Sequence, residues 1–199
     1  MALDLSQHDT PKIIERTLAD FGTIDILINN AAVGSSANPK PVVDFDDDFW
    51  GYTLALNLNA PYLLSKAALP VMLAKKRGRI LNISSLAGKI GLPHGAAYSA
   101  SKHGLLGLTR SLAIEVVKEG ITVNAICPGP VRSEASDKRI QFEATRTGLT
   151  VEELERRSTP IGRRLEPREI VPIALLLADD RAAAITGQAY NVDGGAAMF

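Results

Sequence analysis

The sequence has little of several features that mark particular classes of protein. Cys127 is the single cysteine among 199 residues, which excludes an intrachain disulfide framework and fits a reducing compartment. The formal net charge is zero, from 22 basic and 22 acidic residues, so no electrostatic footprint for nucleic acid or an anionic membrane is present. We therefore expect a cytoplasmic protein whose partners include neither nucleic acid nor a membrane.

Long apolar runs are also scarce. The longest uncharged stretches, such as residues 49–65, contain Asn, Gly and Pro and are too polar to span a bilayer. Charged side chains such as Asp4 and Lys12 interrupt any signal-peptide core near the N-terminus. We predict no metal site. With 46% hydrophobic residues, the chain can bury one sizeable core, and we expect a single domain over residues 1–199.

Short apolar runs and helical patterns alternate along the chain. Residues 24–28, 79–83 and 121–126 read as buried parallel strands. In the first helical pattern, Asp9 is expected to be the N-cap and Pro11 to lie in the first turn, and Phe21 is expected on the buried face. Thr150 and Glu153 predict a capping box further on. The pattern predicts an α/β protein with a parallel sheet.

Tyr98 and Lys102 carry the strongest chemical signal. They lie four residues apart at the start of a helical pattern, so both side chains should share one helix face. A neighbouring cation favours the phenolate and lowers its pKa toward working pH, which would suit Tyr98 as a general acid or base. Such pairs usually form a solvated helix face, so the pair alone predicts little.

Ser85 strengthens the prediction because of its position. It lies thirteen residues before Tyr98, where the predicted strand over residues 79–83 runs into a loop. Ligands in α/β sheets bind beyond the carboxyl ends of the strands, so Ser85 and the Tyr98 helix should face one crevice. Serine, tyrosine and lysine in this order and spacing, with Asn57 upstream, resemble the short-chain dehydrogenase/reductase family, from about Leu3 to the C-terminus.

This resemblance implies a Rossmann-like, doubly wound parallel sheet with helices on both faces, and it implies roles for the four residues. Tyr98 would give or take the hydroxyl proton and Ser85 would hold the carbonyl oxygen. Lys102 would lower the pKa of Tyr98 and bond the cofactor ribose. Asn57 would hold a water in the proton relay, although a buried asparagine bonded to a carbonyl is the structural alternative.

The resemblance also implies NAD or NADP as cofactor, without choosing between them. Asn30 matches the asparagine that approaches the ribose, although an ordinary Asx turn would also explain it. Asp4 and Leu5 would contact the adenine, and residues 128–133 would pack against the nicotinamide. The implied cofactor-binding residues are Asp4, Leu5, Asn30, Tyr98, Lys102, Pro128, Gly129, Val131 and Ser133.

One feature that a dinucleotide fold requires does not occur in the sequence. We find no glycine-rich turn between a first strand and a first helix, where the pyrophosphate would rest on backbone amides. We therefore expect a sheet without the first two strands and most of the third, an exposed edge at residues 24–28, and weak dinucleotide binding. A non-catalytic chain that keeps the family's core, and a translation start further upstream, are the alternatives.

The implied reaction is reversible hydride transfer between a nicotinamide and a ketone or secondary alcohol. Residues 94–107 and 191–195 look most like those of carbonyl reductases of the 3-oxoacyl, polyketide and 3-hydroxybutyrate type. Residues 132–160 would form the substrate lid, where mixed charge does not name a substrate. The long apolar helical regions at 46–75 and 98–117 imply a homo-oligomer, expected to be a tetramer in a complete chain.

Overall fold

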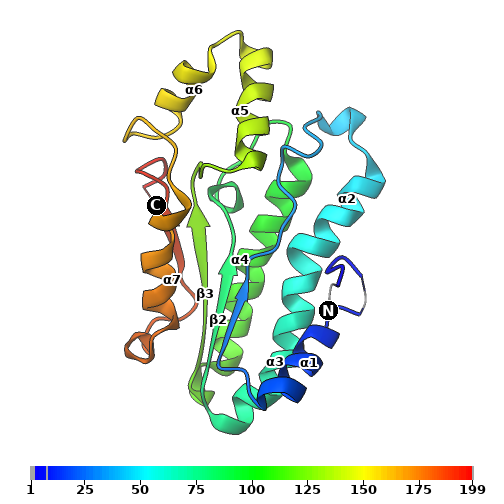
Figure 1. The fold of residues 1–199 in the computed structure, drawn as a ribbon, viewed down its shortest axis with the longest axis vertical. Helices are drawn as coiled ribbons and strands as arrows, with labels where there is room; N and C mark the ends of the chain where they lie inside the picture. The colour runs from blue at the N-terminus through cyan, green and yellow to red at the C-terminus, as the bar shows by residue number, and fades with distance from the viewer. Residues whose placement is uncertain (1–2, 8, 199) are drawn as a thin grey trace.

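A parallel four-stranded sheet organises the protein (Figure 1). The computed structural model describes residues 3–7 and 9–198. The strands follow the chain in the order β1-β2-β3-β4, and every neighbouring pair is parallel. The predicted parallel sheet is thus confirmed, and its strands are β1 (Ile26–Asn29), β2 (Gly78–Ile83), β3 (Ile121–Pro128) and β4 (Ala189–Val192).

Helices cover both faces of this sheet, as the doubly wound architecture requires. Side chains of α1, α3 and α4 pack with Ile80 and Val123 on one face. Leu177 of α7 packs with Leu81 and Ile126 on the other. Successive residues of one strand thus serve opposite layers. The helices are α1 (Lys12–Phe21), α2 (Asp47–Leu54), α3 (Ala60–Lys75), α4 (Ala96–Val116), α5 (Glu134–Thr147), α6 (Val151–Arg157) and α7 (Val171–Ala178).

Helices α2 and α3 are joined by a π-helical segment, η2 (Ala55–Asn59). Asp46 caps the start of α2, accepting hydrogen bonds from the backbone N–H groups of Asp48 and Phe49. The long helical region predicted over residues 46–75 is therefore present. Because π-helical turns are rare and gather at functional sites, the position of Asn57 inside η2 bears on its role.

The first part of the chain differs from expectation. Helix α1 has Pro11 at its N-cap position and no side-chain cap, so Asp9 is not the cap. Phe21 is 76% exposed, so only the earlier part of the predicted apolar face is buried. Residues 3–7 form a turn and pair with no strand in the described part of the chain. The remaining part of the predicted strand remnant, Met1 and Ala2, lies outside the described residues.

Strand β1 forms one edge of the sheet. Its backbone pairs with β2, and within residues 3–7 and 9–198 no strand pairs with its other side. Ile26 and Ile28 point to the same face and are 46% and 48% exposed. The predicted exposed edge is therefore present, two residues further along the chain than expected.

The segment between Val131 and Leu165 leaves the sheet and returns to it at one place. A parallel bridge joins these two residues, and the N–H of Leu165 donates to the carbonyl oxygen of Pro130 at 2.8 Å. Helices α5 and α6 lie within this excursion, above the carboxyl ends of the strands in Figure 1. The capping box predicted at Thr150 and Glu153 opens α6.

Candidate active site

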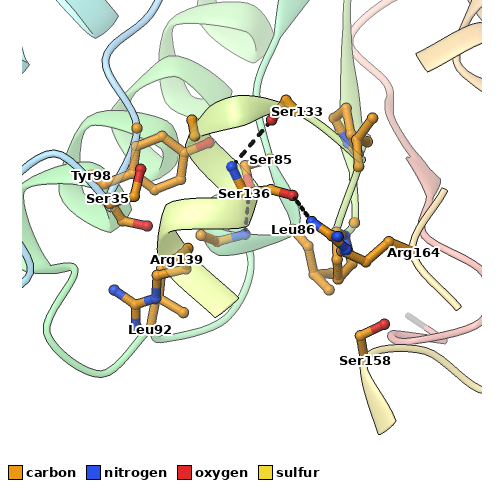
Figure 2. A pocket seen from close by; sticks show the side chains of 18 of the residues that line it. Ser35, Ser85, Leu86, Leu92, Tyr98, Ser133, Ser136, Arg139, Ser158 and Arg164 are labelled. Atoms are coloured by element: carbon orange, nitrogen blue, oxygen red, sulfur yellow. Dashed lines mark hydrogen bonds between the residues drawn. The ribbon is translucent and has the colours of Figure 1, made fainter. Parts of the chain in front are cut away.

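A cavity of about 760 Å³ lies where the carboxyl ends of the strands meet α5. This volume falls within the range of small-molecule sites. Most of the residues that the sequence singles out reach it from several different elements (Figure 2). Those lining the cavity are Asn30, Ser85, Tyr98, Pro128, Gly129, Val131 and Ser133.

Ser85 is held at the cavity by the short helical turn η3 (Leu86–Gly88), which follows β2. Its Oγ accepts a hydrogen bond from the backbone N–H of Ala87 at 3.1 Å. A Cβ on Gly88 would lie 2.8 Å from the carbonyl oxygen of Lys102, so glycine allows η3 to lie directly against α4. This close approach brings the Ser85 hydroxyl and the first turn of α4 to one cavity.

Tyr98 lies in that first turn, and Figure 2 shows its hydroxyl directed toward Ser85. Burial raises the pKa of the phenol, and a hydrogen bond with Ser85 lowers it in part. The direction is opposite to the expected lowering by Lys102. The cost of removing the phenolate from water outweighs the attraction of the Lys102 ammonium, whose Nζ is 5.7 Å from the ring centroid.

Lys102 is buried behind Tyr98, with 3% of its surface exposed. Its Nζ donates to the carbonyl oxygen of Ile83 at 2.8 Å. Burial lowers the pKa of this ammonium to about 8. An ammonium has three donors, and Ile83 is its single hydrogen-bond partner within the described chain. Lys102 can therefore donate to a further acceptor such as a ribose hydroxyl.

Asn57 does not line the cavity and is 1% exposed. Its Oδ1 accepts from the N–H of Val33 at 2.9 Å, and its Nδ2 donates to the carbonyl oxygen of the same residue at 3.0 Å. Nδ2 also lies 3.2 Å from Oγ of Ser101. The side chain thus fixes the chain after β1 against α4, as the structural alternative expects, and its role in holding a relay water stays a prediction.

The two asparagines that end β1 have different surroundings. Nδ2 of Asn29 donates to Oδ1 of Asn82 at 2.8 Å, which joins β1 to β2 through side chains. Asn30 instead faces the cavity. Ser133 caps α5 by accepting from the N–H of Ser136 at 3.2 Å, and its O–H still can donate to a ligand. Asn30 and Ser133 therefore offer amide and hydroxyl groups that suit a nucleotide.

Asp4 and Leu5 lie apart from this cavity. Oδ1 of Asp4 accepts from the N–H of Ser6 at 2.9 Å, and the carbonyl oxygen of Leu5 accepts from Oγ1 of Thr10 at 2.9 Å. Neither residue lines the cavity, and the N-terminal turn lies beside α1 in Figure 1. The structure brings seven of the predicted residues together at the cavity, with Lys102 buried beside Tyr98 and Asn57 buried against Ser101. Asp4 and Leu5 lie outside, because their neighbours fold them into a local turn.

Sequence reasoning missed the charged part of the cavity wall. Arg139, Glu143 and Arg146 of α5 line it, and so does Arg164. Arg139, Glu143 and Arg146 follow one another at spacings of four and three residues, which is typical of one helix face. This spacing is the signal from which the sequence could have predicted that they lie together. Arg164 has no comparable signal, because its position depends on the return of the chain to the sheet.

Other kinds of site find no support in the described residues. No group of three or more His, Cys, Asp or Glu side chains in residues 3–7 and 9–198 could hold a metal ion. Among the helices described, none is long and apolar enough to cross a membrane. Cys127 is buried, and burial raises the pKa of its thiol, which is the reverse of what an activated nucleophile needs.

Comparison with known proteins decides the family. A family model described as enoyl-(acyl carrier protein) reductase matches residues 1–197. The chain belongs to the short-chain dehydrogenase/reductase family. A protein assigned as ketoacyl reductase 1 of the granaticin polyketide synthase in Streptomyces violaceoruber is 42% identical over 180 residues, covering 88% of this chain and 65% of its own length.

Other proteins similar to this chain have related names. A D-beta-hydroxybutyrate dehydrogenase of Rhizobium meliloti is 38% identical over 179 residues, covering 88% of this chain and 68% of its own length. A crystal structure of an actinorhodin polyketide ketoreductase variant with NADPH shares 33% identity at a TM-score of 0.92, covering 100% of this chain and 77% of that one. This likeness confirms the Rossmann-like fold. The chain thus spans about two thirds to three quarters of these proteins.

Proposed function

We propose that this protein is an NAD- or NADP-dependent oxidoreductase that interconverts a ketone and a secondary alcohol. The observation that carries the proposal is that Ser85 and Tyr98 face one cavity (Figure 2), while Lys102 is buried with its Nζ 5.7 Å from the tyrosine ring. A hydroxyl donor, a phenol and an ammonium in that arrangement suit proton transfer to a carbonyl oxygen. The names of the relatives support the same class of reaction.

Each residue has a distinct task in this reaction. Ser85 orients the carbonyl oxygen by donating a hydrogen bond to it. Tyr98 transfers the proton to or from that oxygen, and its raised pKa keeps the phenol protonated and ready for reduction. Lys102 offers its free donors to the ribose and places positive charge behind the phenol. The nicotinamide, when bound, supplies the hydride chemistry.

The residues of the cavity fit such a cofactor. Asn30, Ser133 and the backbone between Pro128 and Val131 would hold the nicotinamide and its ribose, since all of them line the cavity. The substrates that fit the names of the relatives are 3-oxoacyl compounds, polyketides and 3-hydroxybutyrate-like acids. Residues 132–160 would act as the lid over them, because residues of both α5 and α6 line the cavity.

A non-catalytic chain of the same fold is the second candidate. In the described residues no strand pairs with the outer side of β1, and a chain that cannot hold a dinucleotide would keep the fold without the reaction. Titration of the 199-residue chain with NADH and NADPH, followed by fluorescence, separates the two. Saturable binding below about 100 μM, worth more than about 5 kcal/mol, supports the enzyme, and its absence supports the alternative.

We also propose that the protein assembles as a homo-oligomer. Tyr62 of α3 and Ile114 of α4 are 46% and 79% exposed, so both long helices keep apolar side chains on their outer faces. A symmetric interface between copies would bury them. Sedimentation at micromolar concentration should show a dimer or tetramer, and a monomer alone would contradict this proposal.

A further inference from the structure

One wall of the cavity carries charges that the proposed proton transfer does not use. Helix α5 presents Arg139, Glu143 and Arg146 to the cavity, and Arg164 lines it from the returning chain. Much of the remaining wall is apolar, including Leu86, Ile90, Leu92, Ile140 and Leu154. Charges in such surroundings are screened far less than at an open surface. The charged wall therefore bears directly on which substrates the cavity accepts.

Two of these arginines are matched by carboxylates of the protein. Nη1 of Arg164 donates to Oδ1 of Asp137 at 2.6 Å, and its Nε lies 3.6 Å from a carboxylate oxygen of Glu155. Arg146 donates to Oε2 of Glu143 from both Nε and Nη2, at 2.8 and 2.6 Å. The charge of Arg164 is thus compensated by Asp137, while Arg146 depends on a carboxylate that it shares.

Arg139 binds the same carboxylate as Arg146. Its Nη2 donates to the other oxygen of Glu143, Oε1, at 2.5 Å, so one carboxylate serves both Arg139 and Arg146. The three side chains keep one net positive charge. Nη1 of Arg139 is buried and has no hydrogen-bond partner anywhere in residues 3–7 and 9–198. A buried N–H without an acceptor is costly, and Nε of Arg164 is in the same situation.

The guanidinium of Arg139 is also held in place before any ligand binds. Its Nη2 donates to the carbonyl oxygen of Pro93 at 2.6 Å, in the loop that leads to Tyr98. Its Cζ lies 5.4 Å from the centroid of the Phe142 ring, a cation–π distance. A side chain fixed in this way loses little further entropy on binding.

We infer that Arg139 binds the carboxylate of the substrate, so that the cavity selects 3-oxo and 3-hydroxy acids over their neutral esters and amides. The inference rests on the proposed function. A guanidinium pairs with a carboxylate through charge-assisted hydrogen bonds. The reacting carbonyl then lies at Ser85 and Tyr98, while the acid end lies at Arg139 in the same cavity.

Turnover of 3-oxobutanoate and of methyl 3-oxobutanoate tests this selectivity. In Arg139→Gln, KM for the acid should rise by about tenfold to a hundredfold, the size of one charged hydrogen bond, and KM for the ester should stay nearly constant. Arg139→Lys should recover part of the loss. Equal losses for acid and ester, no loss, or a loss confined to cofactor affinity overturn the inference.

Lys138→Gln is the matched control, because Lys138 precedes Arg139 on α5 and its side chain is 63% exposed. This variant should leave both KM values unchanged. Thermal unfolding of each variant verifies that it folds.

A binding measurement separates this inference from the proposed function. Calorimetry with 3-hydroxybutanoate and 3-hydroxybutanamide needs no turnover. The acid should bind at least about tenfold more tightly than the amide, and Arg139→Gln should remove the difference. Equal affinity for both probes, or no binding of either, overturns the inference. A preserved preference for the acid in a chain that turns over no substrate overturns the proposed function alone.

Discussion

Nζ of Lys102 lies 5.7 Å from the centroid of the Tyr98 ring, while its hydrogen bond goes to the carbonyl oxygen of Ile83. The ammonium is thus tied to the end of β2 and lies over the phenol ring. Both side chains are surrounded by protein, which raises the pKa of Tyr98 and lowers that of Lys102. Each group is therefore pushed toward its neutral form.

The lowered pKa of Lys102 predicts a pH dependence of stability. Below about pH 8 the lysine is charged in both states, and burial of the charge destabilises the fold; between about 8 and 10.5 only the unfolded chain keeps the proton, so stability rises with pH. The full effect is about 3 kcal/mol. Urea unfolding at pH 7 and pH 10 should show this rise in the wild type, relative to Lys102→Met.

The raised pKa of Tyr98 has the opposite effect, because above pH 10 the unfolded chain loses this proton first and stability falls as the pH rises. This effect begins only near pH 10 and so leaves most of the range from pH 7 to pH 10 to Lys102. A difference between wild type and Lys102→Met that is constant from pH 7 to pH 10 would contradict the assigned burial of the ammonium. The same variant should also bind NADH or NADPH more weakly, because the donors that remain on Nζ are removed.

Tyr98→Phe should lower turnover far more than cofactor affinity. The change removes the proton donor but keeps the ring that packs in the cavity wall. General acid–base catalysis contributes about 10² to 10⁴ in rate, so kcat should fall by that factor. Steady-state kinetics, together with fluorescence titration of the cofactor, measure both. A fall of less than about tenfold would show that Tyr98 is not the proton donor.

Gly88 sets the contact between η3 and α4. A methyl group there would lie 2.7 Å from Oγ of Ser84 and 2.8 Å from the carbonyl oxygen of Lys102. Gly88→Ala should therefore cost about 1–3 kcal/mol of stability and displace Ser85 from Tyr98, which lowers kcat. Urea unfolding and turnover measure the two effects.

Gly107→Ala is the control for this change, because it lies in α4 and a Cβ there meets nothing within 4 Å. It should raise stability by about 0.5–1 kcal/mol through helix propensity. Equal behaviour of both variants would contradict the close contact.

The sequence alone predicted much of the sheet and most of the site residues at the carboxyl ends of its strands. Apolar runs predicted three of the strands, and the order of Ser85, Tyr98 and Lys102 predicted which side chains meet. Local patterns failed where tertiary packing decides the outcome. Whether a cation lowers or burial raises the pKa of Tyr98 depends on its surroundings, and no spacing in the chain reports them. The same holds for Arg139, whose unused N–H follows from its position against Pro93 and Glu143.

The ends of helix α1 were the other place where the sequence-based predictions were wrong. Asp9 has a residue type that caps helices, yet Pro11 occupies the N-cap of α1. Phe21 continues the apolar pattern of that helix but is its last residue and stays exposed. Periodicity alone does not show where a helix passes the edge of its core.

The edge of β1 leads to a prediction about association. Ile26 and Ile28 project from the same face of an edge strand whose outer backbone groups are unpaired within the described chain. An apolar edge of this kind pairs readily with another chain, and lysine on an edge strand prevents such pairing. The double variant Ile26→Lys and Ile28→Lys should therefore associate less than the wild type. Since both side chains are about half exposed, the loss of stability should stay near 1 kcal/mol.

Light scattering over a concentration series measures this association. Val43→Lys is the control, because Val43 is 88% exposed and lies in the short helical turn η1 (Val42–Asp44), outside the sheet. It adds a lysine at an apolar surface position but leaves the strand unchanged. If the strand edge drives association, the β1 variant should scatter less than the Val43 variant at every concentration. Equal scattering by the two would mean that surface hydrophobicity in general is responsible, and unchanged scattering in both would mean that β1 takes no part in association.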